Sequence, residues 1–382
     1  MFQHNLKIAF RNLLKNKGYS FINITGLAVG LTCFILVILY VRYEFSYESH
    51  HKNAENIYRV NVIHHHPKGE YKISSSMVPL GKTLAEKLPE IKDFTRIENA
   101  GKTLVTYRDK KFIENNMCFA DQGIFHLFSV PPLSGKMESA LMEKYSVVMT
   151  ESMAEKYFGQ EDPLGKTLLL DNEDAYTVTA VIKDFPENTN LSPEFLISFN
   201  TLNDIAGEDF MNNWVTNRLL TYVLLPDNRK ISALEKKINE VTEAHSSTEV
   251  KRTLELEQFS RIHLYSEVSS SQNIQYIYIF LNIGILILVI ASINFMNLST
   301  ARSARRANEV GLRKVVGANR WQLIKQFLGE SILTSFVAFI FSLVLVNIAL
   351  PLFKNLTDQK LFFPAPGEWH FYGMLFAITL AV

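Results

Sequence analysis

The sequence has little cysteine, with two such residues among 382. Cys33 lies in an apolar run and Cys118 in a more polar part of the chain, so we expect no disulfide between them. Cysteines and histidines at a zinc-binding spacing are also missing. These absences exclude a disulfide scaffold and a zinc-ribbon fold, and they say nothing firm about the redox compartment.

Catalytic motifs are missing as well. Three Gly-Lys-Thr triplets look like the end of a P-loop, but the glycine required five residues earlier is replaced by Gln160, Ser76 or Arg96. His64-His65-His66 cannot converge on one metal ion from a strand, because neighbouring side chains point to opposite faces. No Ser, His and Asp arrangement stands at a known spacing. We therefore expect no catalytic residue, no cofactor, no metal site and no enzymatic activity in this chain.

Charged residues are absent from two long stretches, Phe21–Val41 and Ile277–Phe295. An apolar helix of about 20 residues crosses the hydrocarbon core of a bilayer. A pathway for ions would normally carry ionisable side chains at that depth. The two stretches therefore predict membrane spans without an ion pathway.

Charge is divided by position, although the net charge is only +1. Residues 44–276 carry 25 Lys and Arg against 34 Asp and Glu, and the remaining residues carry 14 against 4. This division is typical of a membrane protein with an outer domain, and it argues against nucleic-acid binding. Basic residues precede the first span, and Glu44 and Glu48 follow it, which places the N-terminus inside.

Hydropathy predicts the order of the segments. Residues 1–20 form a cytoplasmic amphipathic helix suited to an anionic membrane surface. Spans are expected at 21–43, 277–298 and 332–353, with the start of a fourth at 371–382. Between them we expect an extracytoplasmic domain at 44–276, a cytoplasmic coupling segment at 299–331 and an outer loop at 354–370. Because the last run has only about 12 residues, too few to cross, we expect a fragment of a longer polypeptide.

Two pairs of residues in the spans suggest helix packing. Gly26 and Gly30 form a G-x-x-x-G pair, which lets a neighbouring helix approach closely. Two incidental glycines explain the pair equally well. Asn294 and Asn297 lie near the inner end of the second span, where an amide usually hydrogen-bonds a neighbouring helix. We favour that structural role over contact with a transported solute.

Residues 44–276 carry mixed strand and helix signals, which predict an α+β domain with its own core, in two lobes. Periodicity predicts strands at Ile57–His64, Ser146–Thr150 and Thr221–Leu225, and helices at Val78–Leu88 and Ile231–Ala244. Lys166–Asp171 and Ala175–Val181 predict a hairpin. The fold class expected for the chain is a multi-pass α-helical membrane protein with four spans, the last incomplete, and a large α+β extracytoplasmic domain inserted between spans 1 and 2.

The segment from Ala301 to Glu330 is basic, with seven Lys or Arg against Glu309 and Glu330. Such an excess in a short loop marks the cytoplasmic side. A first short helix is expected to end at Gly317, and Asn319 suits the N-cap of a second. A solvated basic loop is the simpler interpretation. The alternative is a coupling element, two short helices presented to a soluble partner.

Three stretches carry a family resemblance. Glu309–Ser331, EVGLRKVVGANRWQLIKQFLGES, resembles the signature segment of FtsX/MacB-type ABC transporter permeases. Val147–Leu170 and Tyr176–Pro186 resemble the MacB-like periplasmic core domain, and Tyr47–Val60 is similar to the beginning of that domain. Asn200–Glu267 shows no specific match.

The resemblance implies a permease subunit in the bacterial cytoplasmic (inner) membrane, with no hydrolytic site of its own. Its implied partners are a cytoplasmic ABC-type ATPase, a second membrane half (a homodimer or a duplicated chain), the lipid bilayer, and a periplasmic or outer-membrane protein. The implied ATPase-coupling residues are Glu309, Val310, Gly311, Leu312, Arg313, Lys314, Val315, Val316, Gly317 and Arg320.

Two functions of different classes are compatible with these features. In the first, ATP hydrolysis by the partner moves the outer domain, for export or mechanotransmission, with drugs, peptides, lipoproteins and cell-wall regulation all open as the task. In the second, the outer domain is a sensor or scaffold that binds a ligand or regulates cell-wall enzymes without transport. The third and fourth spans favour the first function, because a simple two-span sensor lacks them.

Overall fold

The computed structural model describes residues 11, 17–227, 230–245, 251–268, 273–305, 315, 320–357, 361 and 367–381. The chain forms two compact units. A membrane unit comprises Met1–Phe45 and Ile274–Val382, and an outer unit comprises Ser46–Asn273. We describe each unit by itself.

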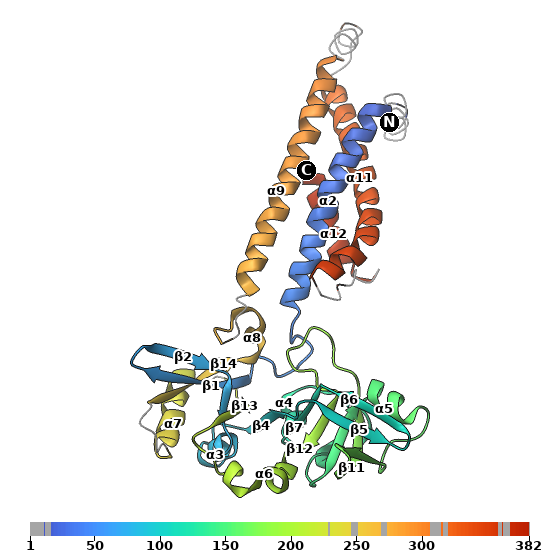
Figure 1. Ribbon diagram of the computed structural model, residues 1–382. Coiled ribbons are helices and arrows are strands. Elements are labelled where there is room, and N and C mark those ends of the chain that lie inside the picture. The colour runs from blue at the N-terminus through green and yellow to red at the C-terminus, as the bar shows by residue number, and fades with distance from the viewer. Residues whose placement is uncertain are drawn as a thin grey trace. The chain divides into compact units, whose positions relative to one another are not determined.

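Apart from Leu361, Gly367 and Glu368, the described part of the membrane unit is helical (Figure 1). Its helices are α2 (Lys17–Phe45), α9 (Asn273–Arg305), α11 (Arg320–Thr357) and α12 (Trp369–Ala381). The first three are long and apolar enough to cross a membrane, whereas α12, at 13 residues, is shorter than a span. Each of the three extends beyond the range that hydropathy predicted, and α11 continues through Pro351 to Thr357.

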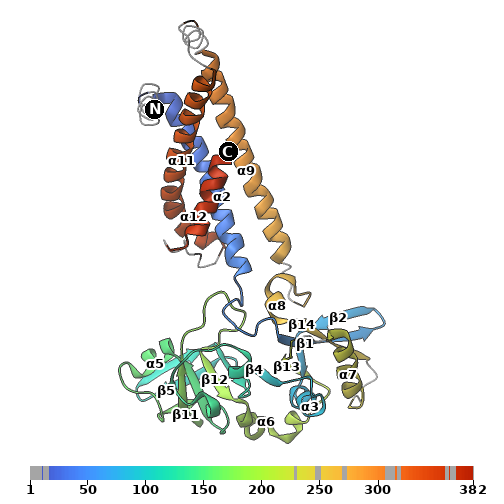
Figure 2. The same cartoon turned by 180° about the vertical axis from the view of Figure 1, so that it is seen from behind.

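Helix α2 packs against the other helices of the membrane unit, as the view from behind shows (Figure 2). Over half of its most apolar window is buried, 56%, against 11% for α9. One apolar cluster joins α2 to α11 and α12, and a second joins it to α9 and α11. Lipid tails give apolar side chains no reason to cluster, so such helices depend on close packing. The residues of the second cluster are Leu27, Ala28, Leu31, Ala291, Phe295 and Ala338.

The outer unit is built on one mixed sheet with the strand order β14-β1-β13-β4-β7-β12-β9-β11-β10-β5-β6. Beside this path β2 pairs with β1, β3 with β13 and β8 with β11. The strands are β1 (Ile57–His66), β2 (Gly69–Ile73), β3 (Ser75–Met77), β4 (Asp93–Asn99), β5 (Thr103–Tyr107), β6 (Lys110–Glu114), β7 (Met117–Ala120), β8 (Pro132–Gly135), β9 (Ser146–Thr150), β10 (Thr167–Leu170), β11 (Asp174–Ile182), β12 (Phe195–Ser198), β13 (Asn217–Leu224) and β14 (Arg252–Gln258).

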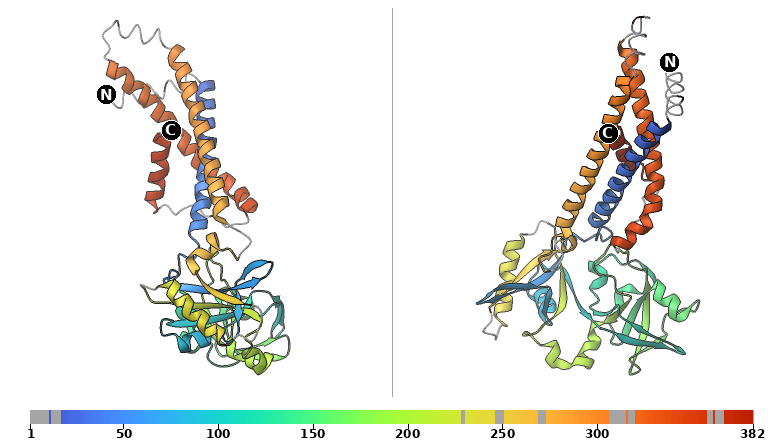
Figure 3. Two further views of the ribbon diagram at one scale, coloured as in Figure 1. Left: turned by 90° about the vertical axis from the view of Figure 1, so that its left-hand side faces the viewer. Right: turned by 45° about the horizontal axis from the view of Figure 1, so that its top comes forward.

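Short helices cover this sheet (Figures 1 and 3). Helix α7 packs on β14, α3 on β4 and β13, α8 on β1 and β14, and α5 on β9 and β11. The helices are α3 (Leu80–Lys87), α4 (Ile124–Leu127), α5 (Glu151–Phe158), α6 (Leu202–Met211), α7 (Ile231–Glu243) and α8 (Phe259–Tyr265), with 3-10 turns η1 (Met137–Ser139) and η2 (Phe199–Thr201).

Several elements of the outer unit agree with the sequence. The strands predicted at 57–64, 146–150 and 221–225 and the helices predicted at 78–88 and 231–244 are confirmed as β1, β9, β13, α3 and α7. The predicted hairpin is confirmed as β10 and β11, with Asp171 and Asn172 at positive φ in its turn. All the described strands join one sheet, and the division into two lobes stays a prediction.

We expect the approach of α2 to α9 at Gly30 to be sensitive to a single methyl group. A Cβ on Gly30 would lie 2.4 Å from the Cβ of Ala291, whereas one on Gly329 of α11 would meet no atom within 4 Å. Gly30→Ala should lower the free energy of unfolding by about 1–3 kcal/mol through overpacking. Gly329→Ala should leave it unchanged or raise it by up to about 1 kcal/mol.

The measurement is thermal unfolding of the detergent-solubilised chain, compared with both variants. Equal transition temperatures for the two variants would show that the helices do not depend on close approach at Gly30.

Candidate functional site

The coupling segment lies between α9 and α11, which the structure ends at Arg305 and begins at Arg320. Of the predicted contact residues between these helices, Val315 is described, and its side chain is 87% exposed. Arg320 is the first residue of α11. The others lie outside the described residues: Glu309, Val310, Gly311, Leu312, Arg313, Lys314, Val316 and Gly317.

All four predicted packing residues lie on α2 or α9, and three of them lie where these helices approach each other. A Cβ on Gly26 would lie 3.4 Å from the amide nitrogen of Asn294, and Gly30 lies against Ala291 one turn away. Asn294 and Asn297 are exposed in the isolated chain, and neither has a hydrogen-bond partner among the described residues. An amide in an apolar helix gains from a partner on another helix. This end of α9 is therefore available to a hydrogen-bonding partner on another helix.

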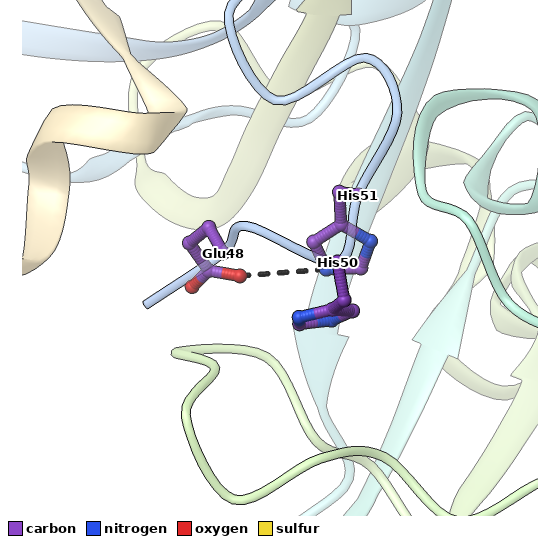
Figure 4. Close-up of side chains that lie close together, drawn as sticks. All are labelled: Glu48, His50 and His51. Atoms are coloured by element: carbon purple, nitrogen blue, oxygen red, sulfur yellow. Dashed lines mark ion pairs between the residues drawn. The ribbon is translucent and has the colours of Figure 1, made fainter. Parts of the chain in front are cut away.

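The outer unit begins with a buried polar cluster that the sequence did not single out (Figure 4). One oxygen of Glu48 and one ring nitrogen each of His50 and His51 lie within 4.8 Å of one another. Glu48 and His51 are 0% and 4% exposed. Their separation of three residues within a turn is the sequence signal that could have indicated the pair.

Hydrogen bonds from neighbouring loops saturate the Glu48 carboxylate. Its Oε1 accepts hydrogen bonds from the backbone N–H and the side-chain amide of Asn190, at 2.6 and 2.9 Å. Its Oε2 accepts one from the Thr189 hydroxyl at 2.7 Å and lies 3.4 Å from Nε2 of His51. Glu48 itself has a φ of 60°, a left-handed conformation that costs energy for a side chain of this size. These contacts offset that strain.

The hydrogen bonds of His51 determine where its proton lies. The backbone N–H of Ser129 donates to Nδ1 of His51 at 3.1 Å, so Nδ1 carries no proton. Nε2 therefore carries a proton, and it lies 3.4 Å from Oε2 of Glu48 without forming a hydrogen bond among the described residues. A protonated nitrogen cannot ligate a metal ion. The geometry therefore favours a structural role for the buried Glu48–His51 pair, which ties loops together, rather than a metal site.

His50 differs from its neighbour. Both of its ring nitrogens are buried without a hydrogen-bond partner among the described residues, whereas His51 lacks one at Nε2 alone. The centroids of the two rings lie 3.9 Å apart, and the rings are tilted by 45°. Burial, and then the neighbouring His51, lower the pKa of His50, whereas Glu48 opposes them. The folded chain therefore favours the neutral form of His50, and nothing in the structure explains its unpaired nitrogens.

The three histidines of β1 are held apart, as the strand geometry predicted. His64 stacks on Tyr71 and contacts Asn217 through Nε2, whereas His65 contacts Glu70 and Thr253. Burial lowers the pKa of His64, and the neighbouring Arg252 lowers it further. These residues have structural partners.

Comparisons with known proteins agree with this architecture. Residues 20–241 match the MacB-like periplasmic core domain, and residues 282–382 match the FtsX-like permease C-terminal domain. The macrolide export ATP-binding/permease protein MacB of Neisseria meningitidis is 27% identical over 191 residues, and that of Aggregatibacter actinomycetemcomitans is 27% identical over 203. In both cases the similarity covers 49% of this chain and 27% of the relative, so the chain spans about a quarter of these relatives.

Solved structures with similarity include a domain of a permease protein and a periplasmic region. A domain of a permease protein from Porphyromonas gingivalis has a TM-score of 0.49 and 22% identity, over 55% of this chain and 91% of that one. The periplasmic region of MacB from Actinobacillus actinomycetemcomitans has a TM-score of 0.41 and 17% identity, over 57% and 95%.

Replacing each of the two adjacent histidines by phenylalanine should have different effects on the stability of the chain. His51→Phe removes the partner of the Ser129 N–H and of Glu48, and should cost about 1–3 kcal/mol of stability. His50→Phe removes two unpaired buried nitrogens and should leave stability unchanged or raised by about 1 kcal/mol. Because the folded chain favours the neutral form of His50, the parent should also lose stability as the pH falls below about 6.5, and His50→Phe should lose less.

Thermal unfolding of the full chain between pH 5 and pH 8 measures both effects. A metal ligated by His50 predicts the reverse result, since His50→Phe would then lower the transition temperature and a chelator would lower that of the parent.

Proposed function

The chain belongs to the FtsX/MacB-type permease family and is thus a membrane component of an ABC transporter, and we propose a coupling role for it. It couples ATP hydrolysis by a separate cytoplasmic ATPase to movement of its outer domain. This movement would serve export or mechanotransmission. The proposal places the N-terminus and the coupling segment in the cytoplasm of a bacterium and the outer unit in the periplasm.

The observation that carries the proposal is the order of the parts. A MacB-like outer unit is inserted after the first span, and the FtsX-like part that follows contains two long helices, α9 and α11, on either side of the basic segment 306–319. A rigid helix transmits a displacement from one end to the other, and α9 and α11 are 33 and 38 residues long. Together with the missing P-loop, this order supports a partner that supplies the ATPase.

Within the coupling segment we assign roles by side-chain chemistry. Glu309, Arg313 and Lys314 make polar contacts with the ATPase, while Gly311 and Gly317 allow close approach and the turn. Three valines, Val310, Val315 and Val316, fill its groove. The exposure of Val315, at 87%, is compatible with this role, because a large apolar side chain left in water marks a contact surface when it belongs to a patch.

A second membrane half is also part of the proposal, supplied by another copy of the chain or by a duplicated chain. Support comes from α9, whose most apolar window is 11% buried within the isolated chain. Asn294 and Asn297 offer amides on the same helix. We further propose that α12 is the beginning of a fourth span.

The alternative function is an extracytoplasmic sensor or scaffold. The size of the outer unit, residues 46–273, is the observation that favours it, since a sheet of this extent offers ample surface for a ligand or a cell-wall enzyme. This function needs no ATPase, so recovery of an ATPase distinguishes it from the first.

Substitutions in the coupling segment should abolish ATPase recovery. In an affinity pull-down from native membranes in mild detergent, the parent should retain an ABC-type ATPase. The double variant Glu309→Lys, Gly311→Trp should lose it, because a reversed charge and a bulky ring would occupy the contact surface.

The matched control is Lys354→Glu, a charge reversal at the other end of α11, which should retain the ATPase. Failure of the parent to retain any ATPase, with intact folding and membrane insertion, would favour the sensor or scaffold function.

A further inference from the structure

The outer unit is attached to the membrane unit at two chain connections. Ser46 follows α2 directly, and residues 266–268 precede the start of α9 at Asn273. A displacement of either helix pulls on the outer unit at these covalent connections. What each connection is tied to therefore decides which part of the sheet moves.

The first connection is tied to the loop between β11 and β12. Ser46 accepts hydrogen bonds from the Asn188 amide through its carbonyl and hydroxyl oxygens, at 2.8 and 3.0 Å. The Glu48 N–H donates to the Asn188 carbonyl at 3.0 Å, and the Glu48 carboxylate accepts three hydrogen bonds from Thr189 and Asn190. We call this set of contacts the first anchor. Since β11 and β12 flank β9, it acts on the middle of the sheet.

The second connection is tied to strands at one end of the sheet. The Arg59 guanidinium of β1 donates to the Ser266 hydroxyl at 3.1 Å and to Glu257 of β14 at 2.7 Å. Lys72 of β2 lies 3.0 Å from the Glu267 carboxylate and also pairs with Glu255. We call this set the second anchor. Its strands, β14, β1 and β2, form the end of the sheet opposite to β6.

Burial strengthens the first anchor and the Arg59 part of the second, whereas Glu267 of the Lys72 pair is exposed. Glu48 and Ser266 are 0% exposed, and Arg59 is 8% exposed. A hydrogen bond to a charged group is roughly twice as strong as one between neutral groups, and leaving such a group buried without its partner costs more still. The segment of the first anchor also contacts α8, since Tyr47 stacks on His263 at 3.4 Å and the ring centroids of His51 and Phe259 lie 5.7 Å apart.

We propose that the outer unit takes up the movement of its two helical connections at separate points, the first anchor moving the middle of the sheet and the second moving its β14-β1-β2 end. Strands β13, β4 and β7 lie between these points in the sheet order. A relative displacement of the two connections therefore becomes a deformation of the sheet, rather than a movement of the outer unit as one block. The inference rests on the proposed function only for the source of the movement.

Hydrogen–deuterium exchange of the full chain in lipid nanodiscs tests whether the anchors are separate, and no ATPase is needed. Glu48→Gln keeps one acceptor oxygen and puts an NH2 donor in place of the other, so the donors of Asn190 and Thr189 lose one of their two acceptors. We expect exchange about tenfold faster in segments 46–54 and 186–192, and within about twofold of the parent in segments 57–64 and 252–258. Lys72→Met, with Arg59→Lys as a second variant, should give the reverse pattern.

Lys82→Met is the matched control, because it breaks an exposed ion pair with Glu86 on α3 and should change neither anchor. Thr189→Val, which removes one hydrogen bond to Glu48, replaces Glu48→Gln if that variant does not fold. Similar acceleration of both sets of segments by any anchor variant would overturn the proposal. Separate responses, in a chain that retains no ATPase, would leave the anchors established and the proposed function contradicted.

Discussion

The bilayer interior offers no hydrogen-bond partners, and this constraint governs the chain. Backbone amides at that depth must bond within their own segment, so each crossing has to be a helix. The three long apolar helices meet this requirement, and the large sheet can form only where water or neighbouring strands satisfy its backbone. The alternation of helix, inserted domain and helices follows from the same constraint.

Ionisable side chains follow the constraint as well. The apolar stretches of α2 and α9 carry none, whereas the outer unit buries several in complete sets of partners. Arg96 is one example, because it forms two hydrogen bonds with Asp121, another with the Val78 carbonyl, and lies 3.9 Å above the Phe199 ring. Glu48 is another. A buried charge costs several kcal/mol without partners, so these networks hold specific strands and loops in specific places.

Local sequence patterns were sufficient to predict those elements in which buried and exposed residues follow a regular order. β9, with five buried residues in a row, and the β10–β11 hairpin, with its polar turn, could be predicted because the pattern repeats within a few residues. Glu48 and His51 could not be predicted as a tie between loops. Their partners, Asn188 to Asn190 and Ser129, lie far along the chain, and no periodicity links positions so distant.

The sequence by itself determined the class of the protein. Three features carry this information: the runs of apolar residues, the division of charge and the motif at 309–331. They consist of composition and short-range order, which folding does not alter. The tertiary structure alone decided that one sheet joins all the described strands, that Gly30 meets Ala291, and that the two connections are tied to different parts of that sheet. These features depend on pairings between distant segments, whose free energy comes from packing and hydrogen bonds that exist only in the folded chain.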